Sequence, residues 1–248
     1  MRSGLRNTIL ISIACVLLVV IILCSTVFTV KNIRVNFLDN NHIMSEAEVL
    51  AQIEDSGSIA KGHSVFIFSK NKAIKMLEKN IPYIRVINLE TICPDTVRVN
   101  CVERKDCYAI KVGNASYLVV DKYYKVLKTV NVTVLPIINL PSDAEVGCFI
   151  DNDKVKYFNA LTNAFDSIAT YENAINVSFA SVELVNTNDR LDFVFKTKEG
   201  GITFNVQNVN ELLNEKINKM VAIMGRCASG ATVNIYALNN EVIAEENA

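Results

Sequence analysis

The sequence has no tryptophan, and only four prolines, nine glycines and two histidines occur among its 248 residues. Because no tract is rich in proline or glycine, we expect the chain beyond its apolar start to be folded throughout. The two histidines, His42 and His63, lie in separate stretches and no C-x-x-C pair occurs, so we expect no metal site. Motifs of the H-E-x-x-H, G-x-S-x-G and P-loop types are also missing, and we expect no catalytic residues, no cofactor and no small-molecule substrate.

Acidic residues are missing from the start of the chain. None occurs before Asp39, so Arg2 and Arg6 make the amino terminus positive. Without these two arginines, 23 basic residues stand against 26 acidic ones, a formal charge of about −3. A nucleic-acid partner would require a basic face, so we expect none. Five of the seven cysteines lie beyond residue 30 at irregular spacing, and an odd number cannot form a complete disulfide framework.

The most prominent feature that is present is an uncharged run of 22 residues, 9–30, between Arg6 and Lys31. As a helix at ~1.5 Å per residue it would extend ~33 Å, enough for the ~30 Å core of a bilayer. We therefore predict a cytoplasmic head at 1–7, a single transmembrane helix at 8–30, and the later residues outside the cytoplasmic membrane. A cleaved signal peptide is the alternative, but its apolar core is usually ~7–15 residues long, and no A-x-A-like cleavage site follows this run.

Short helix and strand patterns follow the apolar run. Ser45 and Glu48 form a capping box, which predicts the start of a helix. Pro94 and Asp95 indicate a turn between two strands, so a β-hairpin is expected there. The predicted elements are a strand at 30–38, helices at 46–55 and 70–79, and strands at 85–92 and 97–103. Their order is β-α-α-β-β.

The rest of the chain alternates between short strands and two amphipathic helices. The predicted strands are 108–112, 117–121, 125–130, 180–185, 191–197, 201–206 and 231–238, and the predicted helices are 154–169 and 209–224. We expect a mixed β-sheet domain flanked by helices over residues 105–238, and a polar, acidic tail at 239–248. With the preceding module, the predicted fold class is α+β.

These patterns resemble one protein family. The stretch 93–104, CPDTVRVNCVER, is similar to the family's aromatic-Pro-Asp-Thr-Leu stretch that ends in Glu-Arg. Further similar stretches lie at 30–35, 62–66, 116–121 and 135–138. Together with a β-α-α-β-β module placed directly after an apolar run, they resemble the bacterial cell-division proteins FtsQ and DivIB and their POTRA domain, here expected at 31–104. One departure is Tyr124, which stands where a turn glycine is usual in the family.

The resemblance implies a function without chemistry. It implies a non-enzymatic divisome scaffold at the division septum that links cell-division proteins outside the cytoplasmic membrane. The implied partners are small bitopic proteins of the FtsB or DivIC and FtsL type, which add a segment to the terminal edge of the β domain. If residues 231–238 form that edge, their backbone is open to β-augmentation. The candidate partner-binding residues are Val233, Asn234, Ile235, Tyr236 and Leu238, of which Tyr236 is the expected anchor.

Two alternatives from other classes remain. A POTRA-bearing transport or chaperone component would bind unfolded substrates through the module's second strand and helix. Two S-x-x-K stretches, Ser58 to Lys61 and Ser69 to Lys72, imitate the nucleophile pattern of penicillin-interacting serine enzymes. The companion elements of such a site are only imitated, at 142–144 and 196–198, which argues against an enzyme.

Overall fold

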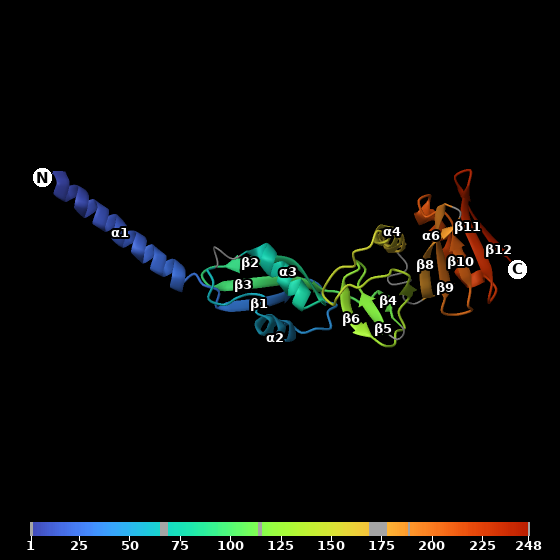
Figure 1. Cartoon of the computed structure of the whole chain (residues 1–248), viewed down its shortest axis with the longest axis horizontal. Helices are drawn as coiled ribbons and strands as arrows, with labels where there is room; N and C mark the ends of the chain where they lie inside the picture. The colour runs from blue at the N-terminus through green and yellow to red at the C-terminus, as the bar shows by residue number, and fades with distance from the viewer. Residues whose placement is uncertain (1, 65–68, 114–115, 169–177, 188, 248) are drawn as a thin grey trace. The chain divides into compact units, whose positions relative to one another are not determined.

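The computed structural model describes residues 2–64, 69–113, 116–168, 178–187 and 189–247 (Figure 1). Within the first helix, the side chains of residues 2–7, 9, 10 and 23–25 lie outside this description. The chain divides into two compact units, Met1–Arg104 and Lys105–Ala248. Each unit has a hydrophobic core of its own.

Helix α1 covers Arg2–Thr26. Among the residues that the structure describes, no helix combines the length and the apolar character that crossing a membrane requires. Some side chains of the predicted span at 8–30 lie outside the description. The predicted span also ends four residues later than helix α1, which ends at Thr26. Val30 is not helical but fully buried in the core of the first unit, where its backbone pairs with Gly62 and His63.

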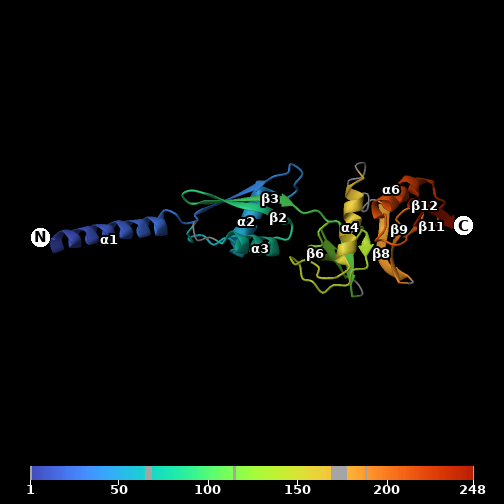
Figure 2. The same cartoon turned by 90° about the horizontal axis from the view of Figure 1, so that it is seen from above.

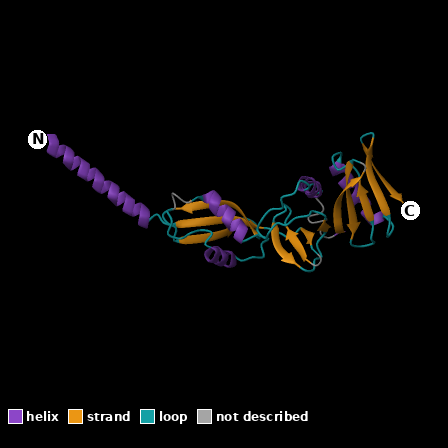
Figure 3. Ribbon diagram, viewed as in Figure 1, coloured by secondary structure: helices purple, strands orange, loops and turns teal. Residues whose placement is uncertain are grey.

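The first unit contains the predicted β-α-α-β-β order (Figure 3). Its sheet has the strand order β1-β3-β2, in which β1 is parallel and β2 antiparallel to β3. The helices contribute buried apolar residues to one core with the strands, as the alternation of the strands predicts. The elements are β1 (Asn32–Phe37), α2 (Glu46–Ser56), α3 (Lys70–Asn80), β2 (Ile84–Ile92) and β3 (Thr96–Glu103).

Local chemistry explains where α2 begins and ends. The Ser45 side chain accepts a hydrogen bond from the Glu48 amide at 3.2 Å, and the Glu48 carboxylate accepts one from the Ser45 amide at 2.8 Å. The predicted capping box is thus confirmed. Gly57 ends the helix with a φ of 60°, a left-handed conformation that favours glycine.

The adjacent residues Glu103 and Arg104 hold different parts of the first unit. Glu103 accepts hydrogen bonds from the amides of Ile43 and Met44, and so fixes the loop before α2. Arg104 donates to the carboxylate of Glu78 on α3 at 3.0 Å and to the Ile84 carbonyl at 3.2 Å. The Glu-Arg pair at the end of β3 therefore ties both helices to the sheet.

The described residues of the second unit form one nine-stranded mixed sheet, with the order β12-β11-β10-β9-β8-β7-β4-β5-β6. Helices α4 and α6 contact each other and share the core beneath the sheet (Figure 2). The first half contains β4 (Tyr108–Val112), β5 (Ser116–Val120), β6 (Val126–Val130), β7 (Ile137–Ile138) and α4 (Val155–Asp166). The second half contains β8 (Phe179–Thr187), β9 (Arg190–Thr197), β10 (Thr203–Val206), α6 (Leu213–Ile223), the 3₁₀ helix η1 (Met224–Arg226), β11 (Thr232–Leu238) and β12 (Glu241–Asn247).

Two predictions for the second unit are wrong. Helix α6 begins at Leu213 instead of residue 209, because Asn208 and Leu212 both have positive φ values, 49° and 45°. The expected polar tail at 239–248 is instead largely strand β12, which pairs with β11 along its whole length. Residue 248 lies outside the described part of the chain. A mixed α+β fold with a large mixed sheet is confirmed.

Candidate partner-binding surface

The chain's last hairpin, β11–β12, forms one edge of the large sheet. Its pairing is regular from Thr232 opposite Asn247 to Leu238 opposite Glu241. The two turn residues, Asn239 and Asn240, have φ values of 52° and 65°. Positive φ at both central positions is the mark of a type I′ turn, whose twist matches that of paired strands. An Asn-Asn pair between alternating residues was the sequence signal for this hairpin, and the sequence prediction missed it.

The residues predicted to bind a partner lie on β11, and they divide between two faces. Val233 and Ile235 are 1% and 0% exposed and belong to the core. Asn234 and Tyr236 point to the other face of the sheet, which we call the outer face, and Leu238 is 54% exposed. The alternation was therefore predicted correctly, but it makes two of the five residues inaccessible to a partner.

Strand β11 is not the edge of the sheet, contrary to the prediction. It pairs in parallel with β10 on one side and antiparallel with β12 on the other. From Thr232 to Ile235 both rows of its backbone groups are therefore engaged within the sheet, and this part of β11 cannot accept a further strand. At this end of the described sheet the edge strand is β12, whose neighbour is β11, and the opposite end of the sheet is β6.

The hairpin geometry shows which backbone groups of β12 point outward. In a two-residue hairpin the closing pair, Leu238 and Glu241, exchanges hydrogen bonds, and bonded and non-bonded pairs alternate from there. Val242, Ala244 and Glu246 are in the non-bonded positions, so their N–H and C=O groups face away from β11. These three residues offer the free ladder that a β-augmenting segment uses.

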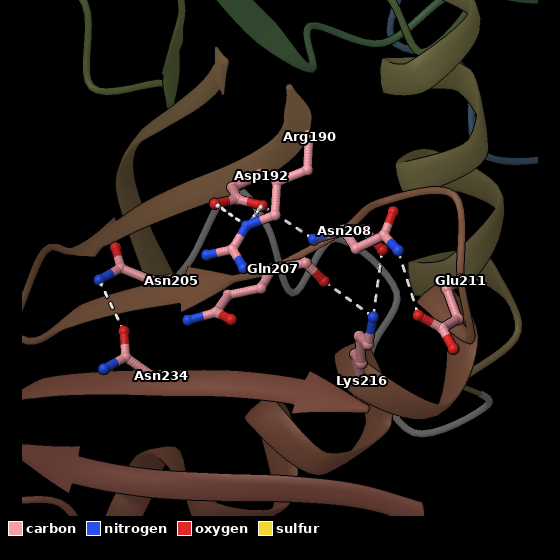
Figure 4. A network of polar contacts seen from close by, with 8 residues as sticks. All are labelled: Arg190, Asp192, Asn205, Gln207, Asn208, Glu211, Lys216 and Asn234. Carbon is pink, nitrogen blue, oxygen red and sulfur yellow. Dashed lines mark hydrogen bonds and ion pairs between the residues drawn. The ribbon is translucent and has the colours of Figure 1, made fainter. Parts of the chain in front are cut away.

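A polar network fixes the strand that supports this hairpin (Figure 4). The buried Lys216 on α6 donates from Nζ to the carbonyls of Gln207 and Asn208, at 2.8 and 3.1 Å. The Asn208 amide donates to the buried carboxylate of Asp192 at 2.8 Å, and the Gln207 amide donates to the Ile235 carbonyl of β11 at 2.9 Å. Burial lowers the pKa of Lys216. The network therefore holds the end of β10, and through it β11, in place.

The outer face of the hairpin is polar, and the edge strand is acidic. Asn205 on β10 donates to Asn234 on β11 at 3.0 Å, as Figure 4 shows. Tyr236 lies directly across the hairpin from Ile243 and donates from Oη to Glu245, two residues further along β12, at 3.4 Å. Strand β12 carries three glutamates and no basic residue. This edge therefore favours a partner segment with basic side chains.

The side chains of the first serine-lysine pattern, Ser58 and Lys61, have separate partners. The Ser58 hydroxyl is buried and bonded to Ser56 at 2.7 Å and Asn80 at 3.0 Å, whereas Lys61 pairs with Glu54 at 2.7 Å. Ser69 stands at the N-cap of α3 without a capping hydrogen bond from its side chain. Among the described residues no cluster of His, Cys, Asp and Glu could hold a metal ion.

The described cysteines are all unpaired. Burial raises the pKa of the Cys101 thiol in the first unit to about 12, and that of the Cys107 thiol in the second unit to about 12. A nucleophilic cysteine needs a lowered thiol pKa, so the raised pKa values argue against a nucleophilic role for these two thiols.

Comparison with known proteins assigns the first unit. Residues 28–104 match the family model of the POTRA domain, FtsQ-type. The expected resemblance to the FtsQ and DivIB family is therefore supported over this unit. Among curated proteins, none matches the chain.

Proposed function

We propose that this chain, whose residues 28–104 are an FtsQ-type POTRA domain, is a non-enzymatic scaffold of bacterial cell division. Its role is to recruit and link division proteins at the septum through contacts outside the cytoplasmic membrane. The partners that fit are small bitopic proteins of the FtsB or DivIC and FtsL type. The carrying observation is the open, outward-facing ladder of β12, supported by a hairpin that is rigidly paired on its inner side.

Strand addition at β12 is the proposed mode of binding. A partner segment would bond to the outward groups of Val242, Ala244 and Glu246, and so extend the sheet by one strand. Its register would then place alternate side chains over the outer face, where Tyr236 and Ile243 lie opposite each other. Of the residues predicted from sequence, Asn234, Tyr236 and Leu238 remain candidates for contact.

The proposed location is the cytoplasmic membrane, with α1 as a single-pass anchor and the two units outside. The described side chains from 11 to 22 on α1 are all exposed, and this stretch carries no charge. Val30 follows α1 by four residues and is already part of the POTRA core. An anchor at α1 would therefore place the POTRA domain directly at the membrane surface.

Affinity capture from dividing cells tests the edge. Ala244→Pro removes one outward N–H, and because proline is tolerated on edge strands, the hairpin is expected to persist. Ala244→Ser at the same position retains the N–H and is the matched control. We expect the proline variant to lose the bitopic partners and the serine variant to retain them. Equal capture by both variants, with the hairpin shown intact by amide exchange, would contradict strand addition at β12.

Extraction of cell membranes with alkaline carbonate tests the anchor. The full chain should remain with the membrane pellet, and a chain lacking residues 1–26 should be released. Release of the full chain would contradict the proposed location while leaving the β12 edge untouched.

A further inference from the structure

Helix α3 of the POTRA domain carries a row of exposed cations. Lys72, Lys75 and Lys79 form the row on one face of the helix, with Met76, which is 38% exposed, beside them, and the exposed Lys70 stands at the start of the helix outside this row. In the described part of the chain, none of these four lysines forms an ion pair. The one acidic residue of the helix, Glu78, is itself paired with Arg104 at 3.0 Å.

Two hollows adjoin this row. One has a volume of about 390 Å³ and is lined by Asn71, Lys72, Lys75, Met76 and Lys79. The other has a volume of about 370 Å³, and its lining includes Lys72, Met76, His63, Ser64 and Ser69. Because Lys72 and Met76 line both, the two hollows form one continuous surface of cations, hydroxyl groups and one thioether.

The second hollow lies where the chain enters the POTRA domain from α1. The Val30 amide donates to the His63 carbonyl at 2.9 Å, and the Gly62 amide donates to the Val30 carbonyl at 2.8 Å. Thr29 forms an isolated β-bridge with Ser64. His63 and Ser64 thus belong both to the wall of the hollow and to the attachment point of the chain that leaves α1.

We propose that this lysine face of α3 binds the anionic headgroups of the phospholipid bilayer in which the chain is anchored. The inference rests on the anchor proposed above. If the anchor ends near Thr26, Thr29 follows it by three residues, and Ser64, which forms a β-bridge with Thr29, lies close to the headgroup layer. Lysines beside an anionic leaflet are attracted to it, and Met76 supplies an apolar side chain for the interface. The face would hold the POTRA domain against the membrane.

Two acidic residues of the POTRA domain outside α3, Glu54 and Asp95, have partners of their own. Glu54 pairs with Lys61 at 2.7 Å. Asp95, in the turn beside the attachment point, accepts hydrogen bonds from Asn32 at 3.3 Å and Thr96 at 3.1 Å. Glu78, the acidic residue of α3 itself, is paired with Arg104, so these carboxylates do not neutralise the lysines of the row by an ion pair.

Lysine acylation of the full chain in lipid nanodiscs tests the proposal. One set of nanodiscs contains phosphatidylglycerol mixed with phosphatidylcholine, and the other contains phosphatidylcholine alone. Acylation is read by mass spectrometry only on chains that co-purify with the discs. We expect the acylation rates of Lys72 and Lys75 to fall about fivefold per lysine in the anionic discs. Lys219, exposed on α6 in the second unit, is the matched internal control and should not change.

The other outcomes each overturn the proposal in a distinguishable way. A chain that does not enter the discs contradicts the anchor and the lipid contact together. A chain that enters without protection of Lys72 and Lys75 contradicts the lipid contact alone. Equal protection in neutral discs supplied with glycerol 3-phosphate would identify a site for free phosphate, and protection that needs an added acidic peptide would identify a protein-binding face.

A double variant tests the lipid contact by amide exchange, which does not depend on the acylating reagent. In the natural chain, we expect amide exchange in α3 to differ between anionic and neutral discs. In the double variant Lys72→Gln, Lys75→Gln, this difference should disappear. In Lys219→Gln it should persist. Because both lysines of the pair are exposed, folding is expected to be unaffected, and 1 M salt should abolish the difference in the natural chain.

Discussion

The guanidinium of Arg104 lies 3.0 Å from the carboxylate of Glu78, and the two side chains are only 4% and 15% exposed. The other carboxylate oxygen of Glu78 accepts a hydrogen bond from the Val86 amide at 2.8 Å. Removing one partner of such a buried pair leaves an uncompensated charge. We therefore expect Glu78→Ala to lower the free energy of unfolding of the POTRA domain by about 3–5 kcal/mol, measured by urea denaturation of the full chain.

The matched control is the exposed pair on the same sheet. Arg98 and Glu90 are 3.4 Å apart, with side chains 39% and 45% exposed. Exposed pairs contribute little, so Glu90→Ala should cost less than about 1 kcal/mol. Similar losses for both variants would contradict the assignment of Glu78 and Arg104 as the tie between α3 and the sheet.

Alkaline pH should weaken the second unit in part through Cys107. Burial raises the pKa of this thiol from 9.0 to about 12, so the folded state retains a proton that the unfolded state loses. Its contribution is therefore fully present below pH 9 and is lost as the pH rises toward 12. Denaturation at a series of pH values should show this decline, and Cys107→Ala should make it shallower, while the buried Tyr108 and Tyr124, whose pKa values burial also raises, keep part of it. An unchanged slope in Cys107→Ala would contradict the assignment of this decline to the buried thiol.

The buried Lys216 should be needed for the support of β11. Lys216→Met retains most of the side-chain volume but leaves the carbonyls of Gln207 and Asn208 without their donor. An unsatisfied buried group costs about 1–3 kcal/mol, and we expect a loss of stability of that size. Amide exchange at Gln207, which donates to Ile235, should accelerate, and capture of the bitopic partners should fall. The exposed Lys219→Met should change neither.

The first unit was predictable because its local signals agree with one another. The capping box of Ser45 and Glu48 and the alternating strands all pointed to the elements that are observed. The end of α1 was not predictable from hydropathy, since Val30 is as apolar as a membrane residue but pairs with Gly62 and His63. Hydropathy reports that a side chain avoids water, and it does not distinguish a bilayer from a protein core.

Tyr124 shows how a turn can keep its geometry without the usual glycine. Its φ is 62°, and Asp121 stabilises the turn by accepting hydrogen bonds from the amides of Tyr123 and Lys125 at 2.9 and 2.8 Å. The fully buried ring also bonds through its hydroxyl to Thr162 at 3.1 Å. The sequence identified the position of the turn, but only tertiary packing explains why a bulky residue occupies it.

For the candidate site, the sequence predicted which side chains of β11 are buried, but it did not predict which strand forms the edge. Alternation along β11 correctly separated buried Val233 and Ile235 from outward Tyr236. The edge itself was assigned to the wrong strand, because the glutamates of β12 suggested a solvated tail. On an edge strand with one face in water, acidic residues are compatible with pairing, and they also discourage indiscriminate association.

The turn residues Asn239 and Asn240 should control the edge that β12 presents. Both have positive φ, which asparagine tolerates and β-branched residues do not, so Asn239→Val should destabilise the hairpin by about 1–2 kcal/mol. Asn240→Gly fits the same turn and should leave stability equal or slightly higher. Amide exchange at Ile243 and Glu245, whose N–H groups face β11, should accelerate in the valine variant only, and partner capture should fall with it. Equal exchange in the two variants would show that the turn does not determine the register of β12, and that its outward groups are positioned by the core contacts of Val242 and Ala244 instead.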